Sequence, residues 1–133
     1  MSSGYLRRYQ TNKVVTASPG ELLLAFYDNA LIQVQTAKKA IDARNFSEKG
    51  QSLGKVLAIL QELDATINDE AAPELSRELH RLYSFMIERV QVANVTMDAH
   101  PLDEVEQLLR SLQEAWQQAI QSEQATIQSQ EAP

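Results

Sequence analysis

Apolar side chains recur along this chain at spacings of three and four residues, the period of a helix that buries one face. The first stripe starts after Ser18 and fades near Arg44. Its apolar members are Leu23, Tyr27, Ala30, Leu31, Val34, Ala37 and Ile41. Ser18 followed by Pro19 and then Glu21 is typical of a capped helix start. The pattern therefore predicts a first helix that begins at Ser18 and ends near Arg44.

Three more stripes of the same period follow, separated by short connections. The second stripe starts after Asn45, whose side chain is expected to cap the helix together with Glu48. Its members are Leu53, Val56, Leu57, Leu60, Leu63 and Ile67. The third stripe opens at Pro73 and contains Leu75, Leu79, Leu82, Tyr83, Met86, Val90, Ala93 and Met97. The fourth follows Pro101 and contains Leu102, Val105, Leu108, Leu109, Leu112, Trp116 and Ile120. Four long amphipathic segments with short connections predict an all-α fold, an antiparallel up-down four-helix bundle over residues 18–120.

The two ends of the chain and two glycines fall outside this pattern. Residues 1–17 are predicted to form an irregular segment, although they carry several apolar side chains. Residues 121–133 are rich in Gln, Ser and Ala and are predicted to be a frayed, flexible tail. Gly50 and Gly54 lie inside the second helix, where each glycine costs up to about 1 kcal/mol relative to alanine. We therefore expect a neighbouring element to approach closely there.

Charge and composition narrow the classes of function. The 133 residues support one domain, and 18 acidic against 12 basic side chains give a net charge of −6. This balance argues against nucleic-acid binding, which needs basic side chains to neutralise phosphates. No apolar run approaches the roughly 18 residues of a membrane span, and the first residues lack the apolar stretch of a signal peptide. Since cysteine is also absent, we expect a soluble cytoplasmic protein with no membrane insertion.

Helical bundles that bind metals or transfer phosphoryl groups carry recognisable histidine motifs. A di-iron bundle requires Glu-x-x-His pairs, whereas Arg77 stands three residues before His80. Met97 occupies the same position before His100. The four glycines are too scattered for a phosphate-binding loop. We expect His80 to lie at the surface or boundary, His100 to lie in a turn, and the protein to have no catalytic site, metal or cofactor.

The first and third helices carry more apolar residues than one buried stripe requires. With a turn of about 100° per residue, the surplus residues lie beside or opposite the main face. They are Leu22, Leu24, Phe26, Leu31 and Ile32 in the first helix and Phe85, Ile87, Val92 and Val95 in the third. Such residues can simply widen a core face, but they also suit grooves that receive a partner's helix. They favour a protein-binding module without naming the partner.

Four blocks of the chain stand in a fixed order between Tyr9 and Ile120. They are Tyr9 with Thr16-Ala17-Ser18-Pro19; Leu22-Leu23-Leu24 with Tyr27-Asp28-Asn29-Ala30-Leu31; Leu82-Tyr83-Ser84-Phe85-Met86 with Arg89, Ala93-Asn94 and Asp98; and Glu104-Val105, Leu108-Leu109, Leu112 and Ala115-Trp116. Together they resemble the flagellin-export chaperone family, FliS. Two positions depart from the family pattern: Asn29 replaces a common glycine, and Gly20-Glu21 replaces a His-Gln-like pair. A bulkier side chain at position 29 is expected to alter packing or groove shape locally and to leave the fold intact.

The resemblance implies a function as well as a helical bundle. Proteins of this family are flagellar secretion chaperones that bind the disordered C-terminal segment of flagellin, prevent premature polymerisation and deliver it to the type III export apparatus. The implied partners are flagellin and the flagellar export gate, and the implied protein is not an enzyme. Either a monomer or a homodimer fits the sequence. The alternative function is that of a general helical adaptor or regulatory protein that binds a folded partner.

The resemblance also implies candidate binding residues. Those of the flagellin-binding groove are Tyr27, Asp28, Leu31, Phe85, Val92, Asn94 and Asp98. The candidates for a cover over the groove when flagellin is absent are Tyr5, Leu6 and Tyr9, in residues 1–17. Structural roles compete for several groove residues, since Tyr27 and Leu31 also lie on the core stripe. Asn94 and Asp98 have helix capping as their alternative role.

Overall fold

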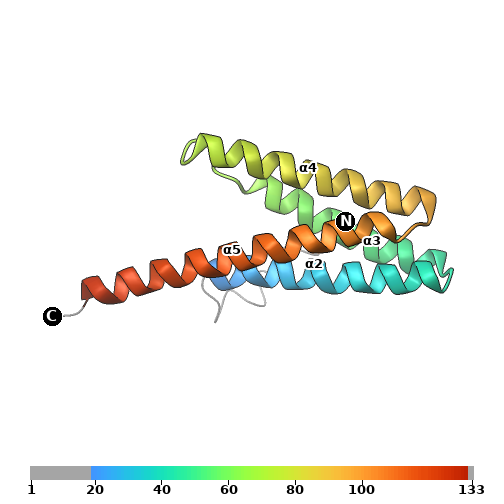
Figure 1. Cartoon of the computed structure of the whole chain (residues 1–133), viewed down its shortest axis with the longest axis horizontal. Helices are drawn as coiled ribbons and strands as arrows, with labels where there is room; N and C mark the ends of the chain where they lie inside the picture. Colours follow the sequence, from blue (N-terminus) through green and yellow to red (C-terminus); the bar gives the residue numbers. More distant parts are fainter. Residues whose placement is uncertain (1–18, 132–133) are drawn as a thin grey trace.

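The computed structural model describes residues 19–131, which form four helices and no strand. The helices are α2 (Pro19–Asp42), α3 (Phe46–Ala65), α4 (Pro73–Thr96) and α5 (His100–Glu131). Successive helices run in alternating directions (Figure 1). Each helix packs against two neighbours, and α5 closes the ring against α2. The predicted all-α, up-down four-helix bundle is confirmed.

Local backbone chemistry explains where two of the helices begin and end. The Asn45 side-chain oxygen accepts a hydrogen bond from the Glu48 backbone N–H at 3.1 Å, and the Asn45 amide donates to the Glu48 carboxylate at 3.1 Å. This reciprocal pair confirms the predicted capping box of α3. Helix α4 begins at Pro73, as predicted, and is closed by Met97, whose left-handed backbone has a φ of 57°.

The buried residues follow the predicted stripes and meet in one core. The largest fully buried side chains are Tyr27, Tyr83, Leu53, Ile59, Leu60, Met86, Leu102, Leu109, Val34, Val56 and Val90. Leu75 departs from its predicted stripe, since it is 53% exposed. Trp116, near the end of the last stripe, is only partly buried against the core. Both residues lie at the end of the bundle where α4 begins.

Ion pairs fasten α5 to its neighbours at the opposite end, near the α4–α5 connection. Lys38 Nζ of α2 lies 2.6 Å from Asp103 Oδ1. Arg89 Nε of α4 lies 3.1 Å from Glu104 Oε2. Away from this connection α4 and α5 diverge (Figure 1). The bundle is therefore closed at one end and more open at the end where α4 begins.

Helix α5 is longer than the apolar pattern predicted. The predicted helix ended near Ile120, followed by a flexible tail over residues 121–133, but α5 continues to Glu131. Residues 121–131 contain Gln, Ala and Glu, which favour helices, and no glycine or proline. A helix that is already nucleated extends readily through such residues. Residues 121–130 are all exposed, so the apolar stripe shows where burial ends and not where the helix ends.

The prediction of a close approach at the glycines of α3 is wrong. A Cβ atom added at Gly50 or Gly54 would meet nothing within 4 Å. The close approach occurs instead at Gly20, where an added Cβ would lie 3.0 Å from the Ile120 Cδ1 atom. The absence of a side chain at Gly20 therefore lets α5 pack tightly against the first turn of α2.

Several predictions fall on residues that the structure does not describe. Ser18 and the irregular segment over residues 1–17 lie outside the described residues, as do residues 132 and 133. The candidate cover residues Tyr5, Leu6 and Tyr9 belong to that segment. A cover over the groove therefore stays a prediction.

Candidate partner-binding site

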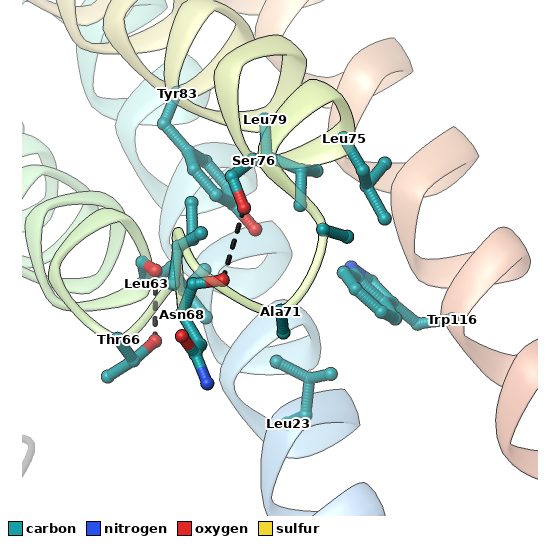
Figure 2. Close-up of a pocket in the computed structure, with 12 residues that line it drawn as sticks. Leu23, Leu63, Thr66, Asn68, Ala71, Leu75, Ser76, Leu79, Tyr83 and Trp116 are labelled. Carbon is teal, nitrogen blue, oxygen red and sulfur yellow. Dashed lines mark hydrogen bonds between the residues drawn. The ribbon is translucent and has the colours of Figure 1, made fainter.

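A largely apolar cavity of about 310 Å³ lies at the more open end of the bundle (Figure 2). Its walls come from all four helices and from residues 66–72, which we call the connecting segment because they join α3 to α4. The lining residues are Leu23, Leu63, Thr66, Ile67, Asn68, Ala71, Ala72, Leu75, Ser76, Leu79, Tyr83 and Trp116. A volume at the small end of the range for ligand pockets suits a large side chain better than a cofactor.

Two tyrosines and a tryptophan form a hydrogen-bonded chain beside this cavity. The hydroxyl oxygens of Tyr27 and Tyr83 lie 2.5 Å apart, and the Trp116 indole N–H donates to the Tyr27 hydroxyl at 3.0 Å. Burial raises the pKa of both tyrosines above the ordinary value, so both hydroxyls stay neutral near pH 7. Because the chain satisfies these polar atoms, they can lie in an apolar interior without a large penalty. It also fixes the indole of Trp116 at the edge of the cavity.

The connecting segment forms one wall through its own hydrogen bonds. Ser76 Oγ donates to the Asn68 carbonyl at 3.2 Å, and Thr66 Oγ1 donates to the Leu63 carbonyl at 2.9 Å (Figure 2). The Glu70 backbone N–H donates to Asn68 Oδ1 at 3.2 Å. These bonds turn the chain at the end of α3 and bring its small apolar side chains toward the cavity.

His80 lies on α4 beside the connecting segment, and each of its ring nitrogens contacts a carboxylate. Nδ1 is 2.5 Å from Asp64 Oδ1, and Nε2 is 2.7 Å from Asp69 Oδ1. These two hydrogen bonds, the Asp64 bond most strongly, raise the pKa of His80 above its ordinary value. Within residues 19–131, no group of three or more His, Asp or Glu side chains is arranged to hold a metal ion.

The predicted groove residues of α2 lie outside the cavity. Tyr27 and Leu31 are buried, with 0% and 7% of their surface exposed. Asp28 Oδ1 accepts a hydrogen bond from Gln113 Nε2 at 2.6 Å. Together with Leu31, Asp28 lines a shallow depression between α2 and α5 that also includes Ile32.

The predicted groove residues on and after α4 lie apart from those of α2. Phe85 is half-buried, and Val92 lines a second shallow depression together with Val95. The exposed Asn94 offers its backbone carbonyl to Lys49 Nζ at 2.9 Å. Asp98 accepts a hydrogen bond from the His100 backbone N–H at 3.0 Å, which is the capping role considered as its alternative. The seven residues thus lie in three kinds of place. Tyr27 and Leu31 are in the core, Asp28, Leu31 and Val92 line the two depressions, and Phe85, Asn94 and Asp98 are half-buried or exposed outside both depressions.

Sequence reasoning missed the cavity at the end of the bundle. The apolar pattern places Ile67, Leu75 and Trp116 on core stripes and predicts only a connection over residues 68–72. The stripe lengths carried no signal of this cavity, because the fourth stripe, from Leu102 to Ile120, is no longer than the first, from Leu23 to Ile41.

The family comparison decides how this arrangement is to be read. The family model described as "Flagellar protein FliS" matches residues 1–123. The chain belongs to the FliS family. Membership makes it a flagellar chaperone and not an enzyme, in agreement with the resemblance that the four sequence blocks carried.

Two relatives show how far the similarity to FliS extends. The flagellar secretion chaperone FliS of Bacillus subtilis (strain 168) is 40% identical over 115 residues, which cover 86% of this chain and 85% of that protein. The flagellar secretion chaperone FliS of Escherichia coli (strain K12) is 32% identical over 110 residues, covering 82% and 81%. The similarity to FliS therefore spans most of this chain and most of each relative.

A solved structure supports the FliS fold independently. It is described as "Crystal structure of flagellar chaperone from bacteria" and superposes with a TM-score of 0.74 at 20% identity, covering 92% of this chain and 99% of the other. At that identity the likeness concerns the fold alone. Among the described helices, none has both the length and the apolar composition needed to cross a membrane.

Proposed function

We propose that this FliS-family protein is a cytoplasmic chaperone that binds the disordered C-terminal segment of flagellin. Binding keeps the segment from polymerising prematurely, and the complex is delivered to the flagellar type III export apparatus. The relatives named flagellar secretion chaperone support this role. This role requires no catalysed reaction, because flagellin needs only a temporary apolar surface in place of its partners in the filament.

The apolar cavity is the observation in the structure that carries the proposal. It lies beside an exposed Leu75 and a partly buried Trp116, which offer apolar surface to a partner. A disordered segment that folds on binding must recover an ordering cost of about 2–5 kcal/mol or more. Apolar anchors inserted in a preformed cavity supply part of that free energy, and the remainder must come from a longer contact.

The two shallow depressions extend the proposed contact along the bundle. Asp28 and Leu31 line the depression between α2 and α5, and Val92 lines the one on α4. Phe85, Asn94 and Asp98 are proposed to border the same contact on the α4 side. Tyr27 contributes indirectly, since it is buried and holds Trp116 through its hydroxyl.

Isothermal titration with a peptide of the flagellin C-terminal segment tests this function. We expect saturable binding at micromolar concentrations, and no binding of a peptide with the same composition in scrambled order. Absence of binding at tens of micromolar would contradict the proposal. Capture of folded partners, but never of flagellin, would support the adaptor function instead.

A further inference from the structure

The wall formed by the connecting segment is held to α4 by few side chains. The segment supplies Thr66, Ile67, Asn68, Ala71 and Ala72 to the cavity lining. Among the described residues, side-chain hydrogen bonds join it to α4 at two points. One is the Ser76 hydroxyl on the Asn68 carbonyl, and the other is the contact between Asp69 and His80. A change at His80 therefore affects one of the two attachments of the wall.

The contact geometry around His80 requires a protonated ring. A neutral imidazole carries one N–H, so only the imidazolium can donate to Asp64 and Asp69 at the same time. The separations of 2.5 Å at Nδ1 and 2.7 Å at Nε2 fit two such charge-assisted bonds. When the ring loses a proton, one carboxylate faces a nitrogen lone pair and is repelled.

The solvent exposure of the two aspartate side chains indicates which carboxylate moves away from the neutral ring. The Asp69 side chain is 69% exposed and belongs to the connecting segment, whereas the Asp64 side chain is 34% exposed and belongs to α3. Asp69 can therefore turn into water with the smaller structural change. The charged neighbours on α4 are Arg77 and the ion pair of Arg81 with Glu78. Among the described residues, the ring forms ion pairs with Asp64 and Asp69 only.

We propose that His80 acts as a pH-dependent clasp on the connecting segment. While the ring is protonated, its contact with Asp69 holds the segment in place as a wall of the cavity. After proton loss, Asp69 leaves the ring and the segment is released. The inference rests on the proposed function, since it concerns the cavity assigned to the client. A wall that is already in place loses less conformational freedom on binding. The client is therefore held more firmly at lower pH, and it is released more readily once His80 is neutral.

The sign of the effect follows from the direction of the pKa change. The pKa of His80 in the folded protein lies above the ordinary histidine value of about 6.5. The stabilisation of the wall is therefore complete below that ordinary value and is lost as pH rises through the higher pKa of the folded state.

Hydrogen exchange of the free, full-length protein tests the clasp without any client. After correction for intrinsic exchange rates, the amides of residues 67–72 should lose protection as pH rises from below the ordinary histidine value of about 6.5 through the raised pKa of His80. Asp69→Asn and His80→Gln should each remove this pH dependence. His100→Gln is the matched control, because this second histidine is 76% exposed at its side chain and lies far along the chain in α5; it should behave like the unmodified protein. Equal protection at all pH values in the unmodified protein would overturn the clasp.

Titration of the flagellin peptide across the same pH range separates the two proposals. We expect affinity to fall about fivefold or more at the higher pH, and to stay constant in Asp69→Asn. By linkage, the bound peptide must raise the pKa of His80, and NMR can measure this change. The increase in pKa should equal the logarithm of the ratio of two peptide affinities, that of the protein with protonated His80 and that of the protein with neutral His80. No peptide binding at any pH rejects the proposed function, while hydrogen exchange still decides the clasp. Binding that is equally strong at all pH values rejects the clasp and leaves the proposed function intact.

Discussion

The hydroxyl of Tyr27 joins three helices at one point. Tyr27 belongs to α2, Tyr83 to α4 and Trp116 to α5, and their polar atoms lie 2.5 Å and 3.0 Å from the central hydroxyl. A complete chain of this kind contributes little net free energy to folding stability, but removing one member leaves buried polar groups without partners. It also sets the position of the indole that borders the cavity, so a single oxygen atom links core stability to the proposed site.

Tyr27→Phe should therefore cost more than the similar change Tyr83→Phe. The first substitution removes the partner of both Tyr83 and Trp116, with an expected loss of about 1–3 kcal/mol. The second leaves the bond from Trp116 in place and should cost less. Urea unfolding measures both free energies, and the tryptophan emission of folded Tyr27→Phe should differ from that of the unmodified protein. A larger loss for Tyr83→Phe would contradict this account.

At the scale of elements, helix α4 has one face in the core and another toward solvent. Tyr83, Met86 and Val90 lie on the buried face, while Val92 lines a shallow depression on the outer side. Beyond the cavity, which Leu79 and Tyr83 line, the proposed contact with flagellin continues along the outer side of α4. Core packing and client binding should therefore respond to different substitutions.

Leu109→Ala and Val92→Ala separate these two roles. Leu109 is fully buried, and its truncation should destabilise the protein by about 2–5 kcal/mol. Val92 is only half-buried, so its truncation should change stability by about 1 kcal/mol or less and weaken flagellin-peptide binding. Thermal unfolding and peptide titration of both variants provide the measurements. If Val92→Ala unfolded as readily as Leu109→Ala, the assignment of Val92 to the contact would be wrong.

At the scale of the whole molecule, the bundle has two unlike ends. Ion pairs of Lys38 with Asp103 and of Arg89 with Glu104 lie near the α4–α5 connection, whereas the cavity lies at the end where α2 and α4 begin. Helix α2 starts at Pro19, which lines a small depression next to the cavity. The chain enters α2 close to the proposed site, which favours the prediction that Tyr5, Leu6 and Tyr9 cover the site when flagellin is absent.

Deletion of residues 1–15 tests this cover. If the segment competes with flagellin, its removal should leave the thermal unfolding temperature nearly unchanged and tighten peptide binding, because the client no longer displaces an internal competitor. Replacing Tyr5, Leu6 and Tyr9 together by serine in the full-length chain should tighten binding in the same direction. An unchanged or weaker affinity in both variants would remove the cover.

What the sequence alone determined about this protein is mostly local in origin. The spacing of apolar residues within each helix, the Asn45 capping box and Pro73 were sufficient to predict four antiparallel helices and most of the core, because each depends on neighbours within one or two turns. The four sequence blocks also carried the family resemblance. The pattern failed at the end of α5, since apolar periodicity records burial and residues 121–130 are helical without being buried.

Only the tertiary structure decided where the candidate functional features lie. The cavity depends on how far α4 diverges from α5 and on the path of the connecting segment, which no single helix specifies. Asp64 and Asp69 precede His80 by 16 and 11 residues, so their meeting depends on the turn between α3 and α4. The same holds for the groove predictions: an angular position on one helix shows which residues are surplus to its stripe, but the neighbouring helix decides whether they are covered. Phe26 is buried while Val95 is exposed, although both lie outside the apolar stripes of their helices.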